Sequence, residues 1–272
     1  MDDSPIGIFD SGFGGLTVAR AVIDLLPSED IVYVGDTGRY PYGPRPLDQV
    51  RRFSRQITAK LISDHAVKMV VVACNTAAAA GLEGLTGSAD VPVVSVVEPG
   101  VRAVLRATRK GRVGVIGTVG TISSGAYQRA VGQLDPTGTV QLTCAACPGF
   151  VEFVERGELD SDQVYVLAER LLAPIRDAKV DSLLLGCTHY PFLARTISDV
   201  VGRDAVLVSS ADETAFELRS LLSVNGLATS RRTAGTHTWI SSGDVETFQR
   251  LGRRLLGPEI DRVVPWNPEP LN

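Results

Sequence analysis

Two cysteines in this chain each follow an apolar run of similar type. Cys74 comes after Val70–Ala73, and Cys187 comes after Leu183–Gly186. Runs of this length are typical of buried strands, and open α/β sheets bind ligands at the carboxyl ends of their strands. Two thiols at equivalent strand ends predict chemistry with two similar proton carriers. Inversion of a carbon centre is such a reaction, because one group removes a proton from one face while the other delivers a proton to the opposite face.

Polar side chains and then a predicted helix follow both cysteines. Asn75 and Thr76 come after the first, and Thr188 and His189 come after the second. A helix N-terminus carries unpaired N–H groups and a partial positive charge, which lower the pKa of a thiol and attract a carboxylate. The sequence therefore predicts an anionic substrate held between two thiols.

The other two cysteines are interpreted as structural. Cys144 and Cys147 form a C-x-x-C pair, but Cys144 lies within a predicted strand, no helix start directly follows, and no second pair completes a zinc site. Four cysteines in a chain of 272 residues do not indicate a disulfide framework. We expect free thiols in a reducing cytoplasm, which is the state that acid/base chemistry needs.

Pyridoxal phosphate on a lysine is the usual alternative for amino-acid chemistry. The chain has only four lysines, at positions 60, 68, 110 and 179, and none lies in an obvious cofactor loop. The glycine loop 12–15 lacks the last glycine of a dinucleotide fingerprint, because position 17 is threonine. It favours a turn through which the backbone approaches a small carboxylate. We therefore expect a route without pyridoxal phosphate and without a metal.

Strands and helices alternate along the sequence, which predicts a mostly parallel sheet. We expect strands at 6–9, 31–35, 70–73, 91–97, 111–117, 140–145, 183–186, 206–208 and 236–241. We expect helices at 16–26, 47–64, 77–82, 101–109, 126–134, 164–178, 213–225 and 245–256, and a glycine-rich loop at 118–125.

The repeat of the cysteine strands predicts an α/β fold of two pseudo-symmetric lobes, with the active site in the cleft between them. Lobe one would comprise residues 1–97 plus 209–272 and carry Cys74. Lobe two would comprise residues 98–208 and carry Cys187.

Composition and charge exclude other classes of protein. The formal net charge is -4, so the chain lacks the basic footprint of a nucleic-acid-binding protein, and we expect no direct nucleic-acid binding. Arginine pairs at 51–52 and 253–254 are interpreted as solvated helix faces. No apolar run approaches the ~18 residues of a membrane helix, and the acidic start lacks a signal-peptide pattern. A cytoplasmic location is expected.

Four motifs together resemble those of a known family. They are Ile8–Thr17, Tyr40–Gly43, Ala73–Ala77 and Gly186–Pro191, and they occur in the order typical of glutamate racemases, in the cofactor-independent aspartate/glutamate racemase superfamily. The resemblance covers essentially the whole chain. It implies interconversion of L-glutamate and D-glutamate by two thiols, which supplies D-glutamate for peptidoglycan synthesis.

The resemblance also implies roles for single residues. Cys74 and Cys187 would be the paired acid/base thiols, with Asp10 assisting the first and His189 the second. The residues that it places at the substrate are Asp10, Ser11, Tyr42, Gly43, Asn75, Thr76, Thr118, Thr121, Thr188 and His189.

Two acidic residues are expected to be auxiliary. Asp36 matches an acidic position that the family places near the site. Glu155 matches the glutamate of a family motif in which Glu152 replaces a proline. The alternative for both glutamates is a solvated acidic face.

Other readings of the sequence stay open. A racemase for aspartate or hydantoins is the nearest alternative, although the residues that flank the two cysteines favour glutamate. A cysteine hydrolase would use Cys187 as nucleophile and His189 as base, but it would leave Cys74 without a role. Family resemblance further implies a homodimer and, as in some members, an interaction with DNA gyrase. A purely regulatory binding protein is the non-enzymatic alternative.

Overall fold

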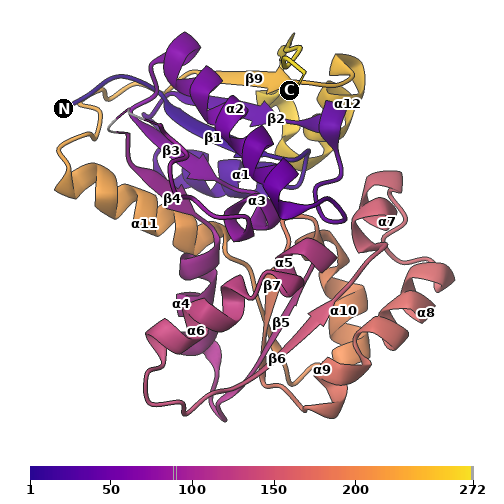
Figure 1. Cartoon of the computed structure of the whole chain (residues 1–272). Coiled ribbons are helices and arrows are strands. Elements are labelled where there is room, and N and C mark those ends of the chain that lie inside the picture. Colours follow the sequence, from indigo (N-terminus) through magenta and orange to yellow (C-terminus); the bar gives the residue numbers. More distant parts are fainter. Residues whose placement is uncertain (88, 90, 271–272) are drawn as a thin grey trace. The chain divides into compact units, whose positions relative to one another are not determined.

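A computed structural model of the chain describes residues 1–87, 89 and 91–270, and two parallel sheets organise them (Figure 1). The first sheet contains, in spatial order, β10 (Val263–Pro265), β9 (His237–Ser241), β2 (Ile31–Gly35), β1 (Ile6–Asp10), β3 (Met69–Val72) and β4 (Val93–Ser95). The second contains β6 (Gln141–Ala146), β5 (Arg112–Gly117), β7 (Ser182–Gly186) and β8 (Val206–Val208). The prediction of mostly parallel α/β structure is confirmed.

The two sheets repeat one topology. The order β2-β1-β3-β4 in the first sheet matches the order β6-β5-β7-β8 in the second, strand for strand along the chain. The strand before Cys74 and the strand before Cys187 occupy the same place in this order, next to the first strand of their own sheet. The sequence repeat around the cysteines is therefore a repeat of architecture.

The described chain divides into two compact units. Unit one comprises Met1–Val96 and Ala211–Asn272, and unit two comprises Val97–Ser210. The last two strands of unit one join the first sheet beside β2, where β9 pairs in parallel register from Ile31↔His237 to Gly35↔Ser241.

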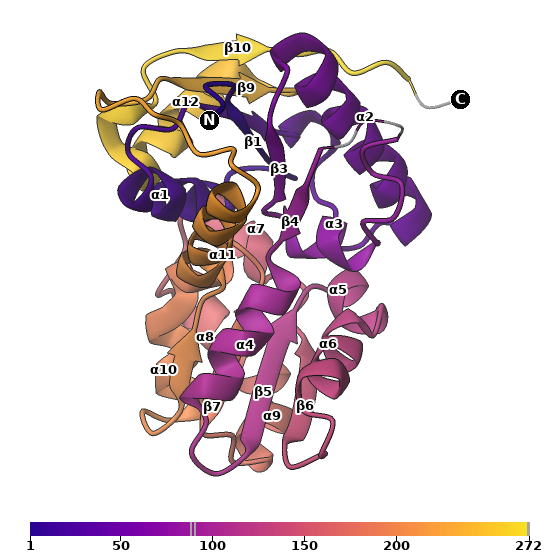
Figure 2. The same cartoon turned by 90° about the vertical axis from the view of Figure 1, so that its left-hand side faces the viewer.

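Helices cover both faces of the sheet in unit one. They are α1 (Leu16–Leu25), α2 (Leu47–His65), α3 (Asn75–Ala79), α11 (Ala211–Val224) and α12 (Val245–Leu256). Helix α1 contacts α11 and α12, whereas α2 contacts α3 and β2. Figure 2 shows α2 on the side of this sheet opposite to α1 and α12. Central strands β1, β2 and β3 are buried throughout, as expected for strands covered on both faces.

Helices also pack around the sheet of unit two. They are α4 (Val97–Ala107), α5 (Val119–Ser123), α6 (Ala126–Leu134), α7 (Phe150–Arg156), α8 (Asp162–Leu171), α9 (Ala173–Asp177) and α10 (Ala194–Val201). Helix α4 contacts β7, β8 and α6, while α10 contacts α8 and α9. None of the helices in the described residues is long and apolar enough to span a membrane.

Several predicted boundaries were wrong. Helix α4 begins at Val97, four residues before the prediction, because Pro99 falls in its first turn, where no N–H is needed. The predicted helix 164–178 is two helices, α8 and α9, with Pro174 in the first turn of the second. Helices α5 and α7 and strand β10 were not predicted. Short 3-10 turns η1 (Thr37–Arg39), η2 (Tyr190–Leu193) and η3 (Gly257–Glu259) were also missed.

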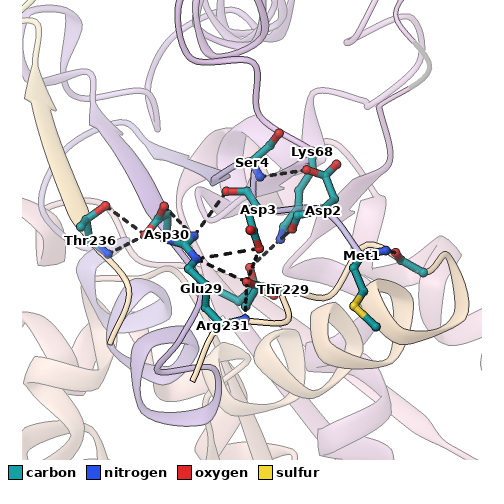
Figure 3. A network of polar contacts seen from close by, with 11 residues as sticks. Met1, Asp2, Asp3, Ser4, Glu29, Asp30, Lys68, Thr229, Arg231 and Thr236 are labelled. Carbon is teal, nitrogen blue, oxygen red and sulfur yellow. Dashed lines mark hydrogen bonds and ion pairs between the residues drawn. The ribbon is translucent and has the colours of Figure 1, made fainter. Parts of the chain in front are cut away.

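A buried ion pair anchors the amino-terminal edge of the first sheet (Figure 3). The Nζ of Lys68 donates to Oε2 of Glu29 and to the carbonyl of Asp2, each at 2.6 Å. Both side chains are almost fully buried. Beside them, Arg231 donates to Asp30 at 2.7 Å. Removing one partner of such a pair leaves an uncompensated buried charge, at a cost of about 3–5 kcal/mol. This edge is therefore a structural anchor.

Candidate active site

Polar side chains follow three neighbouring strands of unit one. Asp10 ends β1, Asp36 follows β2, and Cys74 lies two residues after β3. Strand β1 pairs with both β2 and β3 in parallel, with Asp10 opposite Gly35 and Phe9 opposite Val72. Parallel register therefore brings all three to one edge of the sheet, the carboxyl edge at which α/β folds bind ligands.

Cys74 is the N-cap residue of α3, which begins at Asn75 rather than at the predicted residue 77. Asn75 and Thr76 thus lie in the first helical turn, and both are buried. The Cys74 thiol lies 3.7 Å from the hydroxyl oxygen of Ser11, to which it donates. Only 5% of Cys74 is exposed. The thiol is therefore held in a mostly dry environment with a hydroxyl beside it.

The glycine loop after β1 wraps around the Asp10 carboxylate. Asp10 Oδ2 accepts a hydrogen bond from the backbone N–H of Gly12 at 2.9 Å. A Cβ on Gly15 would come within 2.4 Å of the Asp10 Cβ, so only glycine fits there. Asp10 does not cap α1, because the N-cap is Gly15 and has no side-chain cap bond. The glycine turn was predicted to approach a small carboxylate, and in the structure it approaches the carboxylate of Asp10.

Tyr33 was missed by the sequence analysis although it lies under this loop. Its hydroxyl donates to the carbonyl of Gly12 at 3.0 Å. Complete burial, and then the nearby charges of Asp10 and Cys74, raise the pKa of the Tyr33 phenol well above its ordinary value. Tyr33 is therefore a neutral support of the loop. Its strand position gave no signal that distinguished it from a core residue.

Asp36 is the centre of a second polar cluster. Its buried carboxylate accepts two hydrogen bonds from Arg39 Nε, at 3.0 and 2.8 Å, and one from the Ser242 hydroxyl at 2.5 Å. The Tyr42 hydroxyl also donates to it. Burial, and then the charge of Asp36, raise the pKa of Tyr42 well above its ordinary value. Tyr42 is thus a neutral donor committed to Asp36, and Gly43 follows it in a partly exposed turn.

Unit two presents an equivalent edge with different side chains. Thr118 follows β5, Cys147 follows β6 and Cys187 follows β7, and Gly117 pairs with both Ala146 and Gly186. Thr118 was predicted to lie in a glycine-rich loop, but it is the N-cap residue of α5. Its hydroxyl oxygen accepts from the N–H of Thr121 at 3.2 Å and lies 2.9 Å from the Thr121 hydroxyl.

Cys187 lies at the start of a three-member polar chain. Its sulfur is 3.9 Å from Nδ1 of His189, and Nε2 of His189 is 3.1 Å from Oε1 of Glu155. Glu155 comes from α7, whereas Thr188 and His189 form a turn directly after Cys187. The 3-10 segment η2 comes directly after this turn, and the helix predicted to follow the cysteine begins only at Ala194, as α10.

The charge of Glu155 selects the form of the imidazole. An ionised carboxylate only accepts hydrogen bonds, so it holds the proton of a neutral His189 on Nε2. The lone pair of Nδ1 then faces the Cys187 thiol. This arrangement lets His189 accept a proton from Cys187 and return it.

The remaining cysteines have a different character. All four thiols are free. Burial, together with the charge of Cys187, raises the pKa of Cys147 to about 12, and burial raises the pKa of Cys144 to about 11. Both are therefore protonated at neutral pH. In the described part of the chain, no cluster of three or more His, Cys, Asp or Glu side chains could hold a metal ion.

Comparison with known proteins places this geometry in context. The family described as Asp/Glu/Hydantoin racemase matches residues 16–216. A glutamate racemase of Beutenbergia cavernae is 51% identical over 276 residues, covering 97% of this chain and 93% of that protein.

Solved structures give the same result. The glutamate racemase isoform RacE1 from Bacillus anthracis is 39% identical with a TM-score of 0.89, covering 98% of this chain and 97% of that one. The glutamate racemase from Francisella tularensis, solved in complex with D-glutamate, is 31% identical with a TM-score of 0.88, covering 98% of each chain.

Proposed function

Because the chain belongs to the Asp/Glu/Hydantoin racemase family, we propose that it is a glutamate racemase that interconverts L-glutamate and D-glutamate. The full-length similarity to proteins named glutamate racemase, at about half of all positions, carries this proposal. The D-glutamate formed would supply peptidoglycan synthesis.

Two thiols perform the reaction in this proposal. The thiolate of one cysteine removes the α-proton from one face of glutamate and becomes a thiol, leaving a carbanion at the α-carbon. The thiol of the other cysteine donates its proton to the opposite face and becomes a thiolate. Proton count and charge balance, and the reverse reaction exchanges the two roles. Cys74 and Cys187 are the two proposed residues, because each follows the equivalent strand of a repeated sheet.

The partners of the two thiols differ. His189, oriented by Glu155, takes or returns the proton of Cys187. On the other side, Ser11 accepts from the Cys74 thiol, and the Asp10 carboxylate lies on the same loop. We propose that Asp10 and His189 are the assisting residues of Cys74 and Cys187, respectively.

Substrate contacts come from side chains at both sheet edges. Short hydroxyl and amide groups suit the carboxylates and ammonium group of glutamate, because they donate or accept without adding charge. We propose this role for Ser11, Asn75, Thr76, Thr118, Thr121 and Thr188, and a backbone contact for Gly43. We propose that Asp36 supports the site indirectly, because its carboxylate accepts a hydrogen bond from the hydroxyl of Tyr42 and so holds the Tyr42–Gly43 turn. The two compact units would be the two lobes, each contributing one thiol.

Two of the four lysines hold their amines in ion pairs, which favours a route without pyridoxal phosphate. Lys68 is buried in its pair with Glu29, and Lys60 pairs with Asp64 on the same helix. Neither offers an amine for a Schiff base. We propose that the enzyme needs no pyridoxal phosphate and no metal, acts in the cytoplasm, and forms a homodimer. The interaction with DNA gyrase stays a prediction.

Optical rotation tests the proposed function. Dialysed protein without pyridoxal phosphate should remove the rotation of L-glutamate and of D-glutamate, and should leave L-aspartate unchanged. Folded protein that preserves the rotation of glutamate would refute the proposal. Racemisation of aspartate alone would transfer the assignment to the nearest alternative in the family.

A trapped acyl group tests the hydrolase alternative. Incubation of the protein with an activated glutamyl ester, followed by intact mass measurement, should show no adduct on Cys187. A stable adduct at that cysteine, without racemisation, would favour a nucleophilic role.

A further inference from the structure

We propose that Arg39 and Trp266 are positioning residues, through which the carboxyl-terminal segment 263–269 fixes the turn at Tyr42 and Gly43. The inference rests on the proposed function, because that function assigns this turn to the glutamate site. Trp266 lies far from the turn in sequence, and no family motif in the sequence pointed to it.

Arg39 connects the buried Asp36 to two aromatic rings. Its Nε donates to both carboxylate oxygens of Asp36, while its guanidinium carbon lies 4.2 Å from the ring centre of Phe53 and 5.5 Å from that of Trp266. Only 14% of the Arg39 side chain is exposed. A guanidinium over aromatic rings gains cation–π attraction, which is stronger when water is excluded. The rings therefore hold the cation in place against Asp36.

The carboxyl-terminal segment is attached at two points around this contact. The N–H of Trp266 donates to the carbonyl of Ser241 at 2.8 Å, which continues the pairing of β10 with β9. Three residues later, the carbonyl of Glu269 accepts from Nε2 of Gln56 at 2.8 Å. Gln56 in turn accepts from Nη1 of Arg39 at 2.5 Å. The segment thus contacts the Arg39 side chain directly through the Trp266 ring, and indirectly through Gln56, which binds both Arg39 and the Glu269 carbonyl.

The chain of contacts ends at the predicted substrate turn. The Asp36 carboxylate accepts a hydrogen bond from the Tyr42 hydroxyl. The Tyr42 ring packs on Phe53, with 5.5 Å between the ring centres. Arg39 also packs on Phe53. Loss of the Trp266 ring frees Arg39 to leave Asp36, and the buried carboxylate then loses the cation that balances its charge. We expect the turn to loosen, because its hydroxyl anchor moves with Asp36.

The expected effect is on substrate binding more than on chemistry. The acid/base thiols follow β3 and β7, and neither strand carries Arg39 or Trp266. Loosening a substrate-contact turn raises KM, while the proton-transfer groups stay in place and keep kcat. A general loss of folding would instead reduce the active fraction, lowering kcat at constant KM.

The test compares Trp266→Ala with Trp266→Phe and a control in the same strand. Trp266→Ala should raise KM for glutamate roughly fivefold, within the range of a partly exposed cation–π contact, with kcat within about twofold of wild type. Trp266→Phe should restore most of the affinity, because it keeps an aromatic face. Val264→Ala is the matched control, since Val264 is exposed in β10, and it should match wild type. An unchanged KM in Trp266→Ala, or a lower kcat at constant KM, would overturn the proposal.

Hydrogen exchange provides a second readout that needs no glutamate activity. Amide exchange across residues 36–46 should be faster in Trp266→Ala than in wild type or Val264→Ala, while the 74–79 segment should be unchanged. Equal exchange at 36–46 in all three proteins would refute the positioning role. If wild type fails to racemise glutamate, but exchange at 36–46 is still faster in Trp266→Ala than in the other two proteins, the proposed function fails and the positioning role stands.

Discussion

Cys74 and Cys187 follow equivalent strands of a repeated sheet, yet their surroundings differ. Cys74 occupies the N-cap position of α3 and donates to a hydroxyl at 3.7 Å, on a loop that is wrapped around a buried carboxylate. Cys187 enters a turn and faces an imidazole at 3.9 Å, which is backed by the carboxylate of Glu155. The repeated strands fix where the two thiols lie, and the irregular segments that follow decide which polar group lies beside each of them.

The difference has a chemical consequence. An imidazole with a carboxylate behind it can take a full proton and stabilise the resulting charge, as the carboxylate does in catalytic triads. A serine hydroxyl only accepts and donates hydrogen bonds. We therefore expect the two halves of the reaction to respond differently to changes in their partners, although both thiols are indispensable.

Removal of either thiol should have the largest effect. Cys74→Ser and Cys187→Ser should each lower racemisation by roughly 10²–10⁴-fold, the usual contribution of a general acid or base. The loss should occur in both directions, because each direction uses both groups. Chiral chromatography of glutamate measures it, with Cys144→Ala as the control that keeps activity. Activity near wild type in either serine variant would contradict the two-thiol mechanism.

Glu155→Gln should have the next largest effect and separates the two sides. The amide keeps the shape but loses the charge that supports a protonated His189, so kcat/KM should fall about 10- to 100-fold, as for a hydrogen bond to a charged group. Because enantiomers are equally stable, kcat/KM must fall equally in both directions. The distinguishing signal is the isotope effect from α-deuterated glutamate.

This isotope effect should rise only in the direction in which Cys187 removes the proton. Glu152→Gln is the matched control, since Glu152 lies on the same helix and is exposed, and it should behave like wild type. A rise in both directions would mean that Glu155 serves both thiols and would remove the contrast between the two sides.

Ser11→Ala should have a smaller effect on the other side. A neutral hydrogen bond contributes about 0.5–1.5 kcal/mol, so kcat/KM should fall roughly 2- to 10-fold. The α-deuterium isotope effect should rise in the direction opposite to that of Glu155→Gln. The exposed serine variant Ser63→Ala should show no change. An effect of Ser11→Ala in the same direction as Glu155→Gln would place both residues on one thiol.

Thiol labelling should distinguish Cys147 from its neighbour Cys187 without the need for an activity assay. The pKa of Cys147 is about 12, so at pH 8 only about one molecule in ten thousand carries its thiolate, the form that reacts. Brief iodoacetamide treatment and peptide mass mapping should modify Cys187 and Cys74 before Cys144 and Cys147. Faster modification of Cys147 would show that burial does not hold its proton.

Strand ends could be predicted from the sequence, whereas contacts across segments could not. The apolar runs before Cys74 and Cys187 have the length and flanking residues of buried strands, and both are strands in the structure. The start of α3 was placed two residues late, because Asn75 and Thr76 are weak helix formers and Cys74 gave no capping signal.

Long-range partners explain what was missed. Glu155 was a candidate through family resemblance alone, and its contact with His189 depends on α7, which a left-handed Gly149 introduces at a φ of 92°. Tyr42 at the substrate stays a prediction, and the bond from its hydroxyl to Asp36 could not be foreseen from the sequence. The spacing of Asp36 and Arg39 permitted a local ion pair, while the Trp266 contact depends on how β10 adds to the sheet.

Racemisation in D2O tests the central claim most directly. With L-glutamate and wild-type enzyme, the D-glutamate formed at early times should carry deuterium at the α-carbon, because the second thiol has exchanged with solvent. The remaining L-glutamate should keep its protium, because the first thiol holds the proton that it removed. Proton NMR of the separated enantiomers measures both. Early D-glutamate that keeps the original proton would show that a single group serves both faces, and would contradict the assignment of Cys74 and Cys187 as a pair.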